Sequence, residues 1–146
     1  MYLELSVLLR KHNDMNLALV YLDDAIDLFN SNGDSAGVAN AYNNLGIVYE
    51  AKNELDSALL WYSNALKIYE SLPGAKLGVS YSQCYLGEVY ALQKEYEKAL
   101  VVLNKSLELR LGLDDKFAIC QSYTALGECY SSKGEYNNAI INFKKS

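Results

Sequence analysis

Proline and histidine are both nearly absent from this sequence. Pro73 is the only proline and His12 the only histidine. A proline in a helix interior breaks the helix. Outside the region of residue 73 the sequence has no proline, so long helices can form there without interruption. A single histidine, in a predicted turn, leaves out most metal centres and acid–base sites, and the chain has no Gly-rich phosphate loop or nucleophile motif. We therefore predict that it is not an enzyme and requires no metal or other cofactor.

Positive charge and long apolar runs are also scarce. The chain has 13 Lys and Arg against 18 Asp and Glu, a formal net charge of -5, and no basic cluster. Binding to phosphate backbones needs a positive surface, so nucleic acid is not the expected partner. No apolar run approaches the roughly 20 residues that span a bilayer, and no signal-peptide pattern is present. These absences predict a cytoplasmic chain with no membrane span in this segment.

Cysteine is limited to Cys84, Cys120 and Cys129, an odd number with no Cys-x-x-Cys pair. This count indicates neither a disulfide framework nor a zinc site. Cys129 occupies the repeat position of Val48 and Val89, which predicts a small buried side chain.

A repeated motif is the most prominent positive feature. Leu-Gly-x-x-Tyr occurs three times, with Gly46, Gly87 and Gly127 spaced 41 and 40 residues apart, and an alanine follows nine residues after each tyrosine. A degenerate first unit lies 40 residues before the second. The register divides the chain 1–146 into units of approximately 1–33, 34–74, 75–114 and 115–146, of which the first and last are incomplete. We therefore expect one elongated stack, and a fragment of a larger protein.

Each unit contains two stretches with apolar residues at helical spacing, which predicts two helices per repeat. Tight turns are expected between them, at His12-Asn13-Asp14, Lys52-Asn53-Glu54, Gln93-Lys94-Glu95 and Lys133-Gly134-Glu135. Their central residue is predicted to be left-handed, and the acid that follows suits the positive end of the next helix. Helix breakers mark the connections between repeats, at Asn32-Gly33-Asp34, Pro73-Gly74 and Gly112-Leu113-Asp114-Asp115.

Small residues recur where paired helices would touch. The three glycines lie on the first helices, and Ala58, Ala99 and Ala139 lie on the second. Small side chains allow close helix approach, which predicts an all-α fold of packed antiparallel pairs.

These motifs resemble the tetratricopeptide repeat (TPR) family. The second repeat carries its signature residues in order, as Tyr42, Leu45, Gly46, Tyr49, Ala58, Tyr62 and Ala65. The resemblance implies a right-handed α-solenoid of antiparallel helix pairs, a TPR superhelix. The period near 40 and the missing closing proline are similar to the subclass of LGN-like scaffolds, kinesin light chains and bacterial Rap receptors, and imply longer helices.

The resemblance also implies a concave groove, lined by the first helices, that binds a peptide or partner segment. Counting from each glycine places these candidates on it: Asn40, Asn43, Asn44, Glu50, Tyr81, Tyr85, Glu88, Gln121, Thr124 and Glu128. The asparagines suit a peptide backbone, the tyrosines suit stacking and the glutamates suit a basic segment. The alternatives are solvated surface for the polar residues and packing between repeats for the tyrosines. The carboxylate clamp of some family members is not expected, because Leu3, Val7, Tyr81 and Tyr85 stand where its other groups, including its cations, should be.

The favoured hypothesis is a protein–protein interaction scaffold that binds a peptide or protein partner. The first alternative is a sensory or regulatory TPR region of a larger bacterial signalling protein, such as a peptide receptor, histidine kinase or transcription regulator. A third hypothesis is self-association, in which the end repeats stack on another copy.

Overall fold

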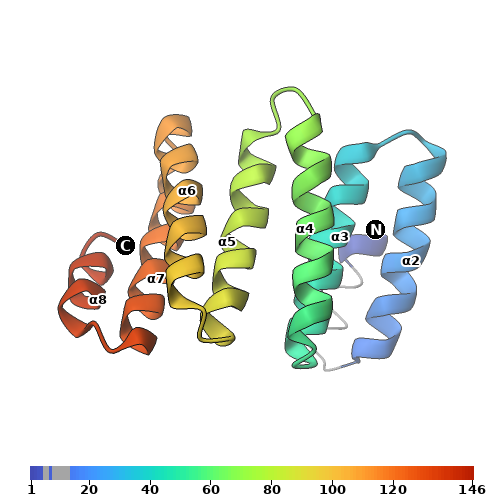
Figure 1. The fold of residues 1–146 in the computed structure, drawn as a ribbon. Coiled ribbons are helices and arrows are strands. Elements are labelled where there is room, and N and C mark those ends of the chain that lie inside the picture. Colours follow the sequence, from blue (N-terminus) through green and yellow to red (C-terminus); the bar gives the residue numbers. More distant parts are fainter. Residues whose placement is uncertain (5–6, 8–13) are drawn as a thin grey trace. The chain divides into compact units, whose positions relative to one another are not determined.

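The computed structural model describes residues 1–4, 7 and 14–146, and in these residues every regular element is a helix. The helices are α2 (Met15–Ser31), α3 (Ser35–Ala51), α4 (Leu55–Ser71), α5 (Lys76–Leu92), α6 (Tyr96–Leu113), α7 (Lys116–Lys133) and α8 (Tyr136–Phe143) (Figure 1). The expected all-α fold is confirmed. The expected turn positions His12 and Asn13 lie outside the described residues.

The chain divides into two compact units, Met1–Ala75 and Lys76–Ser146. In the first unit α3 packs on both α2 and α4. In the second unit α5 packs on α6, α6 on α7 and α7 on α8, while α5 also contacts α7. Short connections make sequential helices antiparallel neighbours, so the units are built from helical hairpins.

Each hairpin turn is closed by backbone hydrogen bonds around one left-handed residue. Asn53, Lys94 and Gly134 have φ values of 61°, 64° and 88°. In the first of these turns Asn53 N–H donates to Glu50 O and Glu54 N–H to Tyr49 O, at 2.8 and 2.9 Å. This is the Schellman arrangement, and it recurs at the other two turns. At the three hairpin turns that the structure describes in full, the predicted left-handed positions are confirmed.

The connections between repeats differ from the prediction at one place. Gly33 and Gly74 have positive φ, as expected of helix breakers. Gly112, predicted to lie in a connection, is instead inside α6, and Asp114 adopts the left-handed conformation with φ of 53°. α6 therefore continues past Gly112 to Leu113. Asp114 can take the capping position because aspartate tolerates the left-handed conformation.

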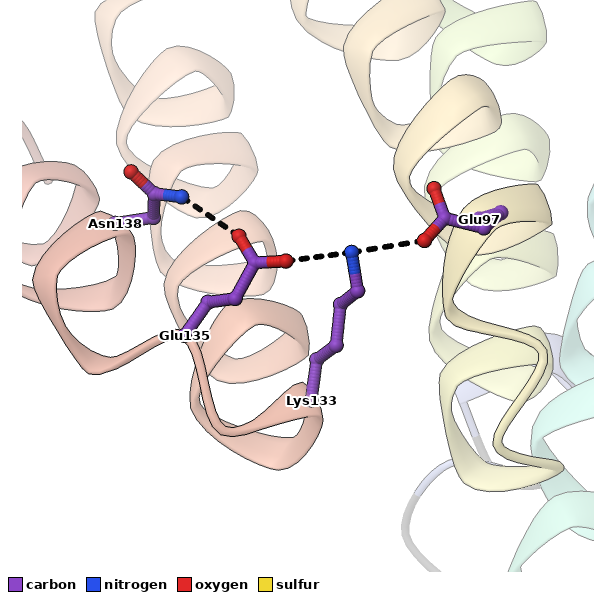
Figure 2. Close-up of polar contacts among 4 residues, drawn as sticks. All are labelled: Glu97, Lys133, Glu135 and Asn138. Atoms are coloured by element: carbon purple, nitrogen blue, oxygen red, sulfur yellow. Dashed lines mark hydrogen bonds and ion pairs between the residues drawn. The ribbon is translucent and has the colours of Figure 1, made fainter.

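The acidic residues that begin the helices use their side chains in two ways. Asp34 and Asp115 accept hydrogen bonds from Gly37 N–H and Ala118 N–H, at 2.8 and 3.0 Å. The glutamates at the hairpin turns make no such cap. Glu135 instead pairs with Lys133 at 2.5 Å, and Lys133 also reaches Glu97 of α6 at 2.8 Å (Figure 2). The extra methylene of glutamate thus favours a lysine partner over its own helix end.

Small residues lie where the paired helices meet. Ala58, Ala99 and Ala139 are buried. A methyl group built on Gly46 would lie 2.5 Å from Tyr62 Cδ1, and one on Gly87 would lie 2.6 Å from Leu103 Cγ. These distances are shorter than van der Waals contact, so the glycines are needed for the observed helix approach. The predicted role of the small residues is confirmed, as is the burial of Cys129, which is 1% exposed.

Candidate partner-binding site

Four of the predicted groove residues belong to the first unit and six to the second. In the first unit Asn44 Nδ2 donates to Asn40 O at 3.0 Å and approaches Asn40 Oδ1 at 3.4 Å. Asn40 is exposed and Asn44 is partly exposed. Asn43 is only 5% exposed, which counting along the helix did not predict. The accessible amides on this face are therefore Asn40 and Asn44.

Glu50 is held against the core of the first unit. Its Oε2 accepts a hydrogen bond from the Tyr62 hydroxyl at 3.0 Å, and Tyr62 is fully buried over Gly46. Burial raises the pKa of the Glu50 carboxyl, and the hydrogen bond from Tyr62 offsets part of that rise. Glu50 therefore links α3 to α4, and this contact limits how freely it can meet a partner.

The second unit contains a pocket of about 320 Å³ between α5, α6 and α7. Its lining residues are Tyr81, Cys84, Tyr85, Glu88, Arg110, Cys120, Gln121, Thr124, Ala125 and Glu128. All six groove residues predicted for this unit are among them. Residues three and four apart share a helix face, and the contact between α5 and α7 brings two such faces together.

Aromatic side chains form one wall of this pocket. Tyr81 and Tyr85 stack with their ring centroids 6.5 Å apart and an interplanar angle of 27°. The guanidinium carbon of Arg110 lies 4.7 Å from the centroid of Tyr81, a cation–π distance. Two adjacent tyrosines with a polar end each provide contact area of the kind that recognition sites use.

Arg110 is the charged site residue that the sequence did not predict. It is 1% exposed, and Nη1 donates to Ala118 O at 2.8 Å and to Ser122 Oγ at 2.9 Å. Its Nε donates to Ser80 Oγ at 3.1 Å. The groove was predicted from the first helices only, whereas Arg110 comes from a second helix. One feature of the sequence could have indicated its role: Arg110 places a charge at the repeat position where the preceding repeat has Tyr69.

Two weak acids of the pocket wall, Cys84 and Tyr85, remain neutral. Burial, followed by the nearby Glu88 carboxylate, raises the pKa of Cys84 to about 12 and that of Tyr85 to about 12. The Cys84 thiol lies 3.7 Å from Glu88 Oε1, to which it donates. A thiol that stays protonated is a poor nucleophile, so this cysteine contributes packing and a weak donor. Within the described parts of the chain, no three His, Cys, Asp or Glu side chains are placed to hold a metal ion.

Comparison with known proteins decides the family. A family model for the tetratricopeptide repeat matches residues 1–71 and 78–146. The chain belongs to the tetratricopeptide repeat family. A TPR chain of this kind is typically a non-enzymatic scaffold for protein–protein interactions. Among the helices that the structure describes, none is long and apolar enough to cross a membrane.

Individual relatives agree with this assignment. The protein "KINESIN LIGHT CHAIN-RELATED 3" from Arabidopsis thaliana is 24% identical over 98 residues, which are 65% of this chain and 15% of that protein. The crystal structure of BtubC (BKLC) from P. vanneervenii matches 99% of this chain and 59% of its own, with a TM-score of 0.82 and 23% identity. The apo form of RapI matches 99% of this chain and 40% of its own, with a TM-score of 0.78 and 20% identity. The two structural matches confirm the predicted fold class, and the chain spans only part of each relative.

Proposed function

We propose that this TPR chain binds a segment of a partner protein in the pocket formed by α5, α6 and α7. The observation that carries the proposal is that the six groove residues predicted for this unit all line one pocket of about 320 Å³. That volume is at the lower end of typical ligand pockets and suits one or two side chains of a longer segment. The candidates in the first unit, Asn40, Asn43, Asn44 and Glu50, remain predictions.

The chemistry of the lining supports a peptide over other ligand classes. The pocket combines the rings of Tyr81 and Tyr85 with the amide of Gln121 and the hydroxyl of Thr124. Aromatic anchors with adaptable polar groups are typical of protein-recognition surfaces. With five more acidic than basic residues in the chain, nucleic acid remains an unexpected partner. A cytoplasmic location and self-association through the end repeats also remain predictions.

A peptide selection on the full chain tests the proposal. Peptides enriched from a random displayed library are titrated against the wild-type chain and against the double variant Gln121→Ala/Glu128→Ala. Both side chains are exposed on α7, so their removal is not expected to disturb the core. The matched control is Asn104→Ala/Glu108→Ala, which makes the same change of charge at exposed positions of α6 outside the pocket.

We expect the pocket variant to lose affinity by about tenfold or more and the control to retain it. Cys120 provides a second measurement, because it is exposed and lines the pocket. A bound peptide should slow its alkylation. Equal affinity for both double variants, together with unprotected Cys120, would show that the segment binds elsewhere.

A further inference from the structure

Arg110 is a buried cation without a carboxylate partner. It is 1% exposed, and within residues 14–146 it forms no ion pair. Its hydrogen-bond partners are neutral: oxygens of Ser80, Ala118 and Ser122, and the Cys84 thiol. Buried charges in proteins are usually paired, because desolvation of an unpaired charge is costly. Among the described residues, however, no carboxylate lies within ion-pair distance of this guanidinium.

The surrounding residues are specialised to hold this side chain. Ser80, Ser106 and Ser122 are all fully buried, and at the repeat positions where they lie the second repeat has Ala39, Ala65 and Ala41. Ser106 Oγ donates to Ser80 O at 2.7 Å, while the hydroxyls of Ser80 and Ser122 accept from Arg110. Alanine would pack equally well in an apolar interface, so the serines indicate that this unit is built around the guanidinium. A guanidinium fixed in this way is preorganised for a ligand.

The hydrogen bonds of Arg110 to oxygen atoms use Nε and Nη1, and the Cys84 thiol is a further neighbour that hydrogen-bonds to the guanidinium. Arg110 also lines the pocket. The planar guanidinium matches the geometry of a carboxylate, which makes arginine the preferred residue for binding this group.

Two acids line the same pocket as Arg110. Glu88 is half-buried beside Cys84, and Glu128 is exposed on α7. A ligand with only a negative charge would be attracted by the guanidinium and repelled by both carboxylates. A ligand with only a positive charge would be attracted by the carboxylates and repelled by the guanidinium. A ligand that carries both charges can place each one beside a group of opposite sign, and such electrostatic complementarity gives specificity.

We propose that this pocket recognises a partner segment in which an acidic side chain lies next to a basic one. The acidic side chain pairs with the guanidinium of Arg110, and the basic one lies against Glu88 and Glu128. This inference rests on the proposed function and specifies the chemistry of the segment. It also revises the expectation from the sequence that this face carries no cation for a carboxylate.

A titration followed by NMR tests the pairing directly. Four synthetic peptides of equal length in a Gly/Ser background carry an adjacent Glu-Lys pair, Glu alone, Lys alone, or neither, and each is titrated into the full chain. We expect the Glu-Lys peptide to bind about tenfold more tightly than the peptide with neither charge. The Nε–Hε signal of Arg110 should shift with both Glu-containing peptides. Equal affinities, or a preference for Lys alone with an unchanged Arg110 signal, would overturn the proposal.

Substitutions assign the effect to each charge. Arg110→Gln should abolish the preference for Glu, whereas Lys105→Gln, the same change of charge at an exposed position of α6, should preserve it. Glu128→Gln should weaken the preference for Lys several-fold and leave that for Glu. If Arg110→Gln does not fold, the Arg110 signal of the wild-type chain decides alone.

The two proposals fail separately. Library peptides that need Gln121 and Glu128, combined with indifference to the Glu-Lys pair, would leave the binding site in place and remove only the charge-pair inference.

Discussion

Adding one methyl group at each signature glycine tests the packing account of this fold. In Gly46→Ala the new methyl would lie 2.5 Å from Tyr62 Cδ1. Tyr62 is fully buried, and its hydroxyl donates to Glu50, so the ring cannot move aside without losing that hydrogen bond. Overpacking of this kind typically costs about 1–3 kcal/mol, while replacing a helical glycine by alanine returns about 1 kcal/mol. The expected net loss of stability is up to about 2 kcal/mol.

Two further glycines set a graded series. In Gly87→Ala the methyl would lie 2.6 Å from Leu103 Cγ and 3.3 Å from Ala99 O, and Leu103 is fully buried. We expect a loss comparable to that at Gly46. In Gly127→Ala the obstacle is the ring of Phe143, 2.6 Å away at Cε1, but Phe143 is 43% exposed at the end of α8. This ring can swing outward, so the net change should be close to zero.

Gly112→Ala is the matched control. It also lies within a helix, but no atom is within 4 Å of the added methyl. Only the gain in helix propensity remains, so the variant should be more stable by about 1 kcal/mol. Thermal unfolding followed by far-UV circular dichroism measures all four variants, since 1 kcal/mol shifts the midpoint by roughly 2–8 °C for chains of this size. A Gly46→Ala midpoint at or above that of the wild type, or shifts of equal sign and size at Gly46 and Gly112, would refute the packing argument.

Two other predictions concern acidity and turn geometry. The pKa of Glu50 is higher in the folded state than in the unfolded state. The protonated carboxyl therefore contributes stability below about pH 4, and this contribution is lost as the pH rises through the folded-state pKa. Glu50→Gln should therefore gain stability relative to the wild type as the pH is raised from about 4 to 7, and thermal melts across this range that stay parallel would contradict it. Gly134, at φ of 88°, tolerates no side chain easily, so Gly134→Ala should lower the unfolding free energy by about 1–2 kcal/mol in urea titrations. An unchanged midpoint would mean that the α7–α8 turn can relax.

Much of the architecture could be predicted from the repeat register alone. The positions of Asn53, Lys94 and Gly134 required a left-handed residue in each hairpin turn, and all three have positive φ. Lys94 shows that position outweighs residue type, because lysine has no preference for this conformation. Gly112 misled the prediction for the opposite reason. A glycine near a helix end indicates a breaker, but α6 continues through Gly112 to Leu113, and Asp114 caps it.

The candidate site was only partly open to the same reasoning. Helical counting placed Tyr81 and Tyr85 on one face of α5, because the periodicity within one helix needs no knowledge of its neighbours. Counting cannot register what a neighbouring helix covers, and Asn43 is therefore buried where the pattern suggested an accessible amide.

The sequence alone specified the helices and how they pair. Both depend on residues close together in the chain, namely the repeat period, the turn residues and the small residues. The environment of Arg110 arose only when α5, α6 and α7 packed together, because its partners Ser80 and Ser122 are 30 and 12 residues away along the chain. Long-range contacts of this kind decide which side chains are desolvated and which charges share a pocket, and no periodicity in the sequence encodes them.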